Sequence, residues 1–418
     1  MIDWKCYLGL LAIGVLTSCG SLQPNPHAVL GSKAPAVQTK EFKEQFAKVG
    51  KSQWLDGNKV ETLTNGNSFF PRMLAAVKAA KKTIVFESFV VVDSQDTYEL
   101  VMALSERSKA GVKVHVILDA VGCRKLDKRY IQAMREAGVE VELYRPFNYF
   151  RPLWSNHRDH RKILVVDGKV GFTGGAGHAH AWRGDARNES EWRDTQYEVR
   201  GPVVADLQRG FINNWKELTG RELSGEAYFP RLGKAGSMEA VSILGAPLEQ
   251  GDTIGSTYLA AIDAAKSSIL IEHAYFLPPK DLREAMKRAC ARGVEVEVIL
   301  PGYKIDAKYV LIGSKLMWKE LLRAGVKIYI YEPSMMHGKL MVVDDKLSII
   351  GSGNFDPRSM FTNDELNLAV LDKAFAREQR AMFESDKLRC KKAIEEDAEV
   401  SFWALPWQWS AWLAMPLL

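Results

Sequence analysis

The sequence predicts an α/β fold in which one domain occurs twice. Three pairs of segments match in the same order along the chain: residues 79–87 match 264–272, residues 110–118 match 292–300, and residues 137–141 match 324–328. A repeat of about 180 residues is far longer than the repeats of solenoid proteins, so it indicates two homologous domains. The 418 residues, 47% of them hydrophobic, are sufficient for two cores.

Helical and extended patterns alternate within each repeat, which predicts two α/β sandwich domains. Helices in both copies end at glycines, namely Gly111, Gly138, Gly293 and Gly325. The segments that follow, such as 112–118 and 294–300, alternate apolar with charged residues or are rich in β-branched ones, as strands are. We expect the two domains to face each other as a pseudo-two-fold dimer within one chain.

These patterns divide the chain into five parts. Residues 55–225 and 226–388 are the expected first and second domains. Residues 20–54 contain proline and small polar residues and are predicted to be a linker. Residues 1–19 form a leader. Residues 389–418 form a tail whose last 18 residues hold four tryptophans and no charge, which favours a segment at a membrane interface.

The leader resembles a bacterial lipoprotein signal peptide. Its apolar stretch from Trp4 to Leu16 is shorter than the roughly 20 residues that a membrane-spanning helix needs. It ends in Leu-Thr-Ser-Cys, which is similar to a lipobox with Cys19 as the lipidated residue. An uncleaved hydrophobic anchor is the alternative. Both predict a membrane-associated protein of the bacterial cell envelope, facing the periplasm in a Gram-negative cell.

A His-x-Lys-x4-Asp motif occurs twice, as His160, Lys162 and Asp167 and as His337, Lys339 and Asp344. Residues two apart on a strand project from one face, so each histidine lies beside its lysine. The aspartate is an odd number of residues from both and opens a hairpin turn. We therefore expect the two aspartates to have a structural role.

Two such motifs supply what the exchange of a phosphodiester requires. One imidazole attacks phosphorus and the other moves protons, because the pKa of histidine lies near neutrality. The ammonium groups of Lys162 and Lys339 neutralise the phosphate. No metal ion and no other cofactor is expected, and the chain has no P-loop for a nucleotide.

Residues after each motif offer further polar groups. Ser352 and Asn354 follow the second motif, and Gly175 stands where Ser352 does in the first copy; we expect all three to bind phosphate. Gly177 stands at the position of Asn354, so the first half lacks that amide. His178 and His180, which are close in sequence, are candidates to replace it.

Two carboxylates lie at similar offsets after the motifs, Asp194 in the first half and Glu365 in the second. A carboxylate that orients an imidazole and stabilises its cation is what each histidine requires. His157, His160, His178 and His180 lack the spacing of a metal site, and no metal site is expected. Residues 148–154 mix aromatic with basic groups; a contact with lipid and an ordinary packed loop are both open.

The motifs resemble those of the phospholipase D superfamily, and within it the bacterial cardiolipin synthases, over residues 55–385. The resemblance is carried by His-Arg-Lys-Ile-Leu-Val-Val-Asp, Trp-Arg-Asp-Thr and Asn-Phe-Asp-Pro-Arg-Ser. It implies a phosphatidyl-histidine on the first motif, hence His160 as nucleophile and His337 as general acid and base. The implied substrate is phosphatidylglycerol in a membrane, and the implied products are cardiolipin and glycerol. Oligomeric state stays open.

Three other functions fit parts of the pattern. A hydrolytic phospholipase D would pass the same intermediate to water and give phosphatidic acid. A nuclease would need a long basic cleft, and a formal charge of +5 without a dense run of lysine and arginine does not favour one. A lipid-binding envelope protein without activity would not need both complete motifs.

Overall fold

The computed structural model describes residues 34–400. The first half of the chain forms β1 (Leu55–Thr64), α3 (Gly66–Ala79), β2 (Thr83–Ser88), α4 (Gln95–Lys109), β3 (Lys113–Asp119), α5 (Lys128–Glu136), β4 (Glu140–Tyr144), α6 (Pro152–Asn156), β5 (Lys162–Val166), β6 (Val170–Gly174), η2 (His180–Trp182), β7 (Thr195–Arg200) and α7 (Val204–Thr219).

The second half repeats this succession with small differences. It forms β8 (Met238–Gly245), α8 (Pro247–Gln250), α9 (Thr253–Ala264), β9 (Ser268–His273), α10 (Lys280–Ala291), β10 (Glu295–Pro301), α11 (Lys308–Arg323), β11 (Lys327–Tyr331), β12 (Lys339–Val343), β13 (Leu347–Gly351), α12 (Pro357–Phe361), β14 (Glu365–Leu371), α13 (Lys373–Lys387), β15 (Cys390–Lys392) and η3 (Glu395–Ala398).

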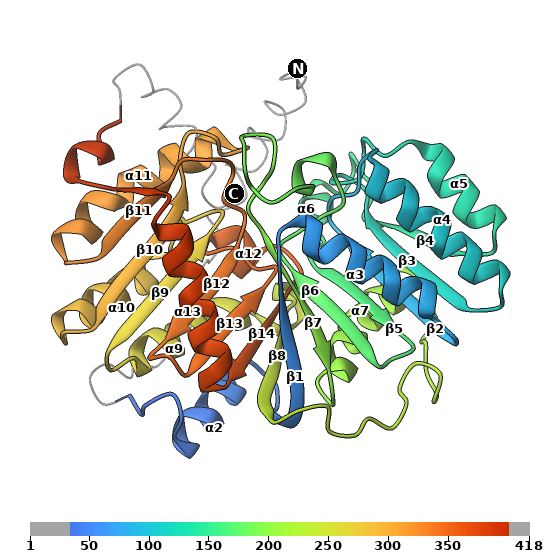
Figure 1. Ribbon diagram of the computed structural model, residues 1–418, viewed down its shortest axis with the longest axis horizontal. Coiled ribbons are helices and arrows are strands. Elements are labelled where there is room, and N and C mark those ends of the chain that lie inside the picture. The colour runs from blue at the N-terminus through green and yellow to red at the C-terminus, as the bar shows by residue number, and fades with distance from the viewer. Residues whose placement is uncertain (1–33, 401–418) are drawn as a thin grey trace.

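One mixed sheet runs through both halves in the order β15-β11-β10-β9-β12-β13-β14-β8-β1-β7-β6-β5-β2-β3-β4 (Figure 1). From the central β1–β8 pair outward, the two halves have the same strand order. In each half, three strands are parallel (β2-β3-β4 and β9-β10-β11) and the strands nearer the centre are antiparallel. The predicted duplication and α/β fold are confirmed.

Side chains that alternate along each strand pack against helices on opposite faces of the sheet. In β2, Ile84 and Phe86 belong to the core beneath α3 and α4, whereas Val85 belongs to the core beneath α7. In β9, Ile271 faces the α9 side and Leu270 faces the α13 side. This period of two is what a strand buried on both faces requires. One cluster of buried residues includes α7 and α13, so the two halves share part of their core.

Within the segment predicted as a linker, residues 20–54, the described part contains a packed helix, which corrects that expectation for residues 40–49. Residues 40–49 form helix α2 (Lys40–Val49), which packs against α9. The hydroxyl of Thr39 accepts a hydrogen bond from the Phe42 N–H and caps the helix. Phe42 and Phe46, four residues apart on one face, are fully buried. The spacing of four residues between Phe42 and Phe46 is typical of one face of a helix, and it was the feature that could have predicted α2 within this polar segment.

The predicted tail is likewise shorter than expected. Residues 390–392 form β15, which pairs antiparallel with β11 and extends the sheet. The short helix η3 follows and packs against α11. The lipidation candidate Cys19 and the tryptophan-rich residues 401–418 lie outside the described residues.

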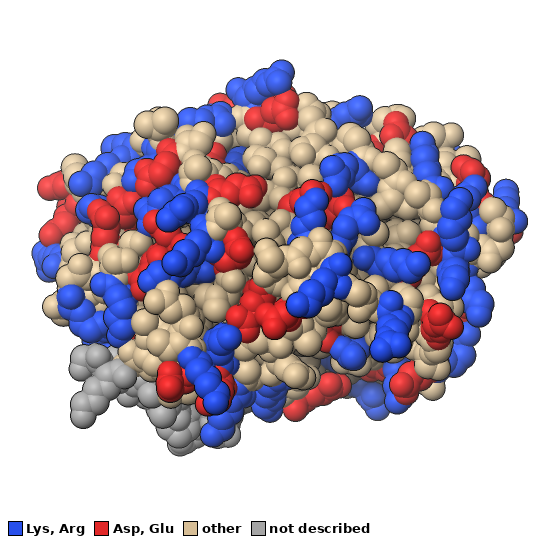
Figure 2. Space-filling view, turned by 60° about the horizontal axis from the view of Figure 1, so that its bottom comes forward, with Lys and Arg blue, Asp and Glu red and all other residues tan. Residues whose placement is uncertain are grey.

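Between residues 34 and 400, no helix is both long and apolar enough to cross a membrane. On the face shown in Figure 2, lysine and arginine side chains alternate with aspartate and glutamate over most of the surface.

Candidate active site

Both motifs lie at the same edge of their half-sheets. Lys162 is the first residue of β5 and pairs with Ser88 at the end of β2. Lys339 is the first residue of β12 and pairs with His273 at the end of β9. The motif histidines therefore stand where the parallel strands end, the edge at which ligands bind in open α/β sheets.

The motif aspartates lie at the other end of these strands. The Asp167 carboxylate accepts hydrogen bonds from the N–H groups of residues 81–83, at 2.6 to 3.1 Å. Asp344 accepts from the N–H groups of residues 266–268 and from the hydroxyl of Ser267. Each aspartate thus fixes the turn that leads into β2 or β9, away from the histidines.

The main chains of the two halves exchange partners at the site. The His160 N–H donates to the carbonyl of Asp364, at 2.9 Å. The His337 N–H donates to the carbonyl of Arg193, at 2.7 Å. Asp364 precedes Glu365, and Arg193 precedes Asp194. The main chain of each motif histidine is therefore hydrogen-bonded to the residue just before the carboxylate of the other half.

As a result, each histidine contacts a carboxylate of the opposite half. His160 Nδ1 lies 2.8 Å from Glu365 Oε1, and His337 Nδ1 lies 2.6 Å from Asp194 Oδ2. Because an ionised carboxylate only accepts hydrogen bonds, Nδ1 carries the hydrogen in both rings and the lone pair lies at Nε2. Lys339 Nζ lies 3.2 Å from Nε2 of His337. The sequence predicted both carboxylates but gave no sign of this exchange.

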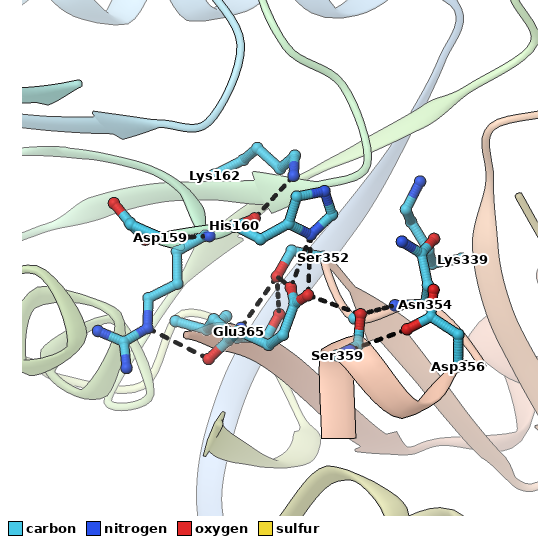
Figure 3. Close-up of polar contacts among 12 residues, drawn as sticks. Asp159, His160, Lys162, Lys339, Ser352, Asn354, Asp356, Ser359 and Glu365 are labelled. Atoms are coloured by element: carbon cyan, nitrogen blue, oxygen red, sulfur yellow. Dashed lines mark hydrogen bonds and ion pairs between the residues drawn. The ribbon is translucent and has the colours of Figure 1, made fainter. Parts of the chain in front are cut away.

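Glu365 is held by two hydroxyl groups in addition to His160 (Figure 3). Ser352 Oγ donates to Oε2 at 2.5 Å, and Ser359 Oγ donates to Oε1 at 2.7 Å. Glu365 is completely buried. These donors fix the carboxylate in place and leave it no freedom to turn away from His160.

Asp194 is held by different groups. Trp182 Nε1 donates to Oδ2 at 2.8 Å, and the Thr195 N–H donates to Oδ1 at 2.8 Å. The ring of Trp182 also packs edge-on against His337. Trp182 and Ser359 both come 22 residues after the histidine of their own motif, an offset by which the sequence alone could have found them.

The two lysines are buried next to their histidines. Lys162 Nζ donates to the carbonyl of His160 at 2.7 Å, and Lys339 Nζ donates to that of His337 at 2.6 Å. Burial lowers the pKa of Lys162 to about 7 and that of Lys339 to about 8. Burial therefore removes water from both ammonium groups, and a bound anion would stabilise their charge in place of that water.

Burial also keeps the imidazoles neutral. It lowers the pKa of His160 to about 4, with Lys162 acting in the same direction and Glu365 opposing it. Burial and the ammonium of Lys339 lower the pKa of His337. Burial alone would raise the pKa of Glu365, but His160 and Lys162 hold it at about 2. Each half of the site thus pairs a neutral imidazole with an ionised carboxylate.

Two of the three expected phosphate-binding residues have other roles. The Gly175 N–H donates to the carbonyl of Thr195, so it is not available for an anion. A Cβ atom at Gly175 would lie 2.3 Å from Asp194 Oδ1, so the glycine leaves room for that carboxylate. Ser352 is fully buried and donates to Glu365. These expectations were wrong because both residues serve the carboxylates.

Asn354 remains a candidate for contact with phosphate. Its side chain is largely buried, and its Oδ1 has no hydrogen-bond partner among the described residues. His178 packs between Phe70 and Phe86 and lines a small internal cavity together with Lys162, while His180 is exposed to solvent.

Two further histidines also have defined places. His157 Nε2 lies 2.9 Å from Asp364 Oδ1 and belongs to a buried polar network beneath the site. His273 is fully buried against the rings of Tyr258 and Phe355. Within residues 34–400, no three histidine, cysteine, aspartate or glutamate side chains converge as metal ligands.

Comparison with known proteins agrees with this geometry. The model of a family described as "Cardiolipin synthase, PLD-like domain" matches residues 73–198 and again residues 258–387. The chain belongs to this family. The predicted family is confirmed, and so is the predicted enzyme class, a phospholipase D-type phosphatidyltransferase.

Curated relatives and solved structures extend the likeness to most of the chain. Cardiolipin synthase A of Pseudomonas entomophila is 33% identical over 84% of this chain and 73% of its own. Cardiolipin synthase 2 of Bacillus cereus is 36% identical over 81% of this chain and 65% of its own. The crystal structure of phosphatidylserine synthase from Haemophilus influenzae Rd KW20 shares the fold, with a TM-score of 0.64 and 13% identity over 91% of this chain and all of that one.

Proposed function

We propose that this member of the cardiolipin synthase family transfers a phosphatidyl group from one phosphatidylglycerol to another through a phosphatidyl-histidine. The observation that carries the proposal is the exchange of carboxylates: Glu365 and Asp194 each hold the histidine of the other half by Nδ1. Both rings thereby have their lone pair at Nε2, the atom that would meet the substrate. The names of the relatives support phosphatidylglycerol as the substrate and cardiolipin as the product.

In the first step His160 is the nucleophile. Its neutral ring has a lone pair at Nε2, which attacks phosphorus, and the bond from phosphorus to the oxygen of the glycerol headgroup breaks. His337, protonated at Nε2, gives its proton to that oxygen and glycerol leaves. Glu365 stabilises the positive charge that develops on His160.

In the second step a hydroxyl of another phosphatidylglycerol attacks the same phosphorus. His337, now neutral, accepts the proton of this hydroxyl, and Asp194 stabilises the cation that forms. The bond between phosphorus and Nε2 of His160 breaks. Two phosphatidylglycerols are thus converted into one cardiolipin and one glycerol, and no nucleotide is consumed because one phosphodiester replaces another.

The two lysines provide charge for the phosphate oxygens. An anionic phosphodiester beside Lys162 and Lys339 replaces the solvation that burial removes, so it raises the pKa of both groups and keeps them charged. A phosphate close to His337 also raises the pKa of that ring and prepares it to act as an acid. The side-chain N–H of Asn354, a largely buried residue, would donate to the same anion.

The test uses the purified full chain and phosphatidylglycerol vesicles, with product analysis by mass spectrometry. We expect cardiolipin and glycerol in equal amounts. Phosphatidic acid without cardiolipin would identify a hydrolase and contradict the proposal. Because a phosphohistidine is hydrolysed in acid and survives in base, quenching in alkaline detergent with lipid labelled in the phosphate should trap label on the parent chain, but not on a His160→Asn variant.

A role at the cell envelope completes the proposed function. It is supported by the lipobox-like sequence around Cys19 and by four tryptophans within residues 401–418. Incorporation of labelled palmitate, lost in Cys19→Ala, is the expected result. No label on the parent protein would contradict lipidation.

A further inference from the structure

The internal repeat shows which residues the fold does not require. The connection from β4 to β5 has 17 residues (145–161), whereas its counterpart from β11 to β12 has 7 (332–338). Helix α11 has 16 residues, whereas its counterpart α5 has 9. Both helices end before the same Ala-Gly pair, so the additional residues of α11 lie at its start. Each half therefore contains one insertion that the other half lacks.

The insertion in the first half presents aromatic side chains to solvent. Tyr149 is 83% exposed and Phe150 is 96% exposed. The loop is nevertheless held by its own hydrogen bonds: the Asn148 N–H donates to Ser155 Oγ at 2.8 Å, and the Phe150 N–H donates to Asn148 Oδ1 at 2.9 Å. The loop is thus fixed with its two aromatic residues pointing outward, and no described part of the chain covers them.

The insertion in the second half has the same character. Its inner side chains, Val310 and Leu311, are buried in the core. On its outer side and in the loop before it, Tyr303 is 75% exposed and Leu316 is 43% exposed. The ammonium of Lys315 lies 5.1 Å from the centre of the Tyr303 ring. An outer face that mixes apolar and lysine side chains is typical of helices that lie at a membrane surface.

Both insertions adjoin the catalytic edge. In the first half, Arg358 of α12 donates to the carbonyl of Asn156, four residues before His160. In the second, Lys304 donates to the carbonyl of Pro333, four residues before His337. Figure 1 places α6 and α11 along the upper side of their halves. Each insertion is thereby tied, at Asn156 and at Lys304, to the chain close to the segment that leads into a motif histidine.

The charge of these segments fits an anionic surface. The first segment, residues 145–156, has no acidic residue; its Arg151 is exposed, whereas Arg145 is buried against Glu217. Residues 303–316 contain Lys304, Lys308 and Lys315 and one aspartate, and Lys304 pairs with Glu189. Aromatic side chains partition into the interface of a bilayer, and nearby basic groups add attraction to anionic lipids.

We propose that residues 145–156 and 303–316 form a membrane-docking rim that holds the catalytic edge against an anionic bilayer. This inference rests on the proposed function, because a lipid substrate is what makes docking at this edge useful. With the rim at the interface, a phospholipid headgroup reaches the two histidines while its acyl chains stay in the bilayer. The two insertions then act together, one from each half.

The test measures hydrogen exchange of the full chain with and without phosphatidylglycerol vesicles. We expect slower exchange in peptides that cover 145–156 and 303–316, and unchanged exchange in peptides of α4. A Tyr149→Ser/Phe150→Ser variant should bind these vesicles about tenfold more weakly. The matched control is Met102→Ser, which removes a half-exposed apolar side chain from α4 and should bind as the parent does.

Two further measurements separate the outcomes. Turnover of monomeric short-chain phosphatidylglycerol should be unchanged in the double variant, while turnover of vesicles falls. Lys308→Gln should weaken vesicle binding more than Lys109→Gln, a lysine at the far end of α4. Unchanged exchange in both segments, or equal vesicle binding by the double variant and the parent, would overturn the rim. Protection of both segments without any cardiolipin formed would support the rim and contradict the proposed function alone.

Discussion

His160 and Glu365 come from different halves of the chain, and His160 Nδ1 lies 2.8 Å from Glu365 Oε1. Asp194 and His337 form the reciprocal pair, at 2.6 Å. Neither half therefore contains a complete catalytic group. The two halves must therefore lie together, because a separated half would have a carboxylate without its imidazole and an imidazole without its carboxylate.

Replacing Glu365 with glutamine tests this pairing. The amide keeps the volume of the carboxylate but removes the charge that stabilises a cationic His160, so we expect kcat to fall about 100-fold or more with a small change in KM. Steady-state assays on phosphatidylglycerol, with circular dichroism to establish folding, provide the measurement. Glu106→Gln, which changes an exposed carboxylate of α4 away from the site, is the control. A kcat within twofold of the parent would contradict a role for Glu365.

Trp182→Phe tests the group that holds Asp194. The substitution removes the 2.8 Å hydrogen bond from Nε1 and keeps an aromatic ring against His337. We expect a loss of stability of about 1 kcal/mol and a decrease in kcat of about tenfold, because Asp194 loses one of its fixed donors. Thermal denaturation and kinetics measure the two effects. Trp54→Phe, outside the site, should lower stability without lowering kcat; the same loss of kcat in both variants would argue against positioning by Trp182.

Much of this site was predictable from the sequence, and the remainder was not for definite reasons. The repeated motif located both histidines and both lysines, and the similar offsets of Asp194 and Glu365 located the carboxylates. Each offset is measured from the histidine of the same half. It therefore cannot indicate that Asp194 contacts His337 and Glu365 contacts His160. The exchange follows from main-chain pairing across the interface, which depends on the arrangement of whole domains.

The same limit explains the incorrect expectations for Gly175 and Ser352. A small-residue turn next to a phosphate-binding motif is typical of an anion site. Here the turn lies behind the carboxylates: Ser352 Oγ reaches Glu365, and Gly175 leaves the space that Asp194 occupies. Helix α2 is a different case, because the sequence could have predicted it. Phe42 and Phe46 have helical spacing, but the polar residues around them made the segment look like a linker.

Binding of an anion should take up protons. The pKa of Lys162 is about 7 and that of Lys339 is about 8 in the free protein, so part of each is neutral at pH 8. A bound phosphodiester raises both values, so protons are taken up between about pH 7 and the raised pKa, and affinity falls as pH rises through this range. Calorimetry with a glycerophosphodiester in buffers of different ionisation enthalpy measures the uptake. Lys162→Met should reduce the number of protons; an uptake of zero in the parent at pH 8 would contradict the prediction.

Asp344→Ala should separate stability from catalysis. The Asp344 carboxylate accepts hydrogen bonds from three successive N–H groups, residues 266–268, and lies at the end of β12 away from His337. Since these N–H groups lose a common acceptor, we expect the free energy of unfolding to fall by about 2 to 3 kcal/mol. Well below the melting temperature, kcat should stay within about threefold of the parent, because no catalytic contact is removed. Denaturant titration and kinetics on the same preparation measure both. Loss of activity in a variant with unchanged stability would instead give Asp344 a role in the chemistry. Asp167 accepts the equivalent hydrogen bonds from residues 81–83, so Asp167→Ala repeats the measurement independently in the other half.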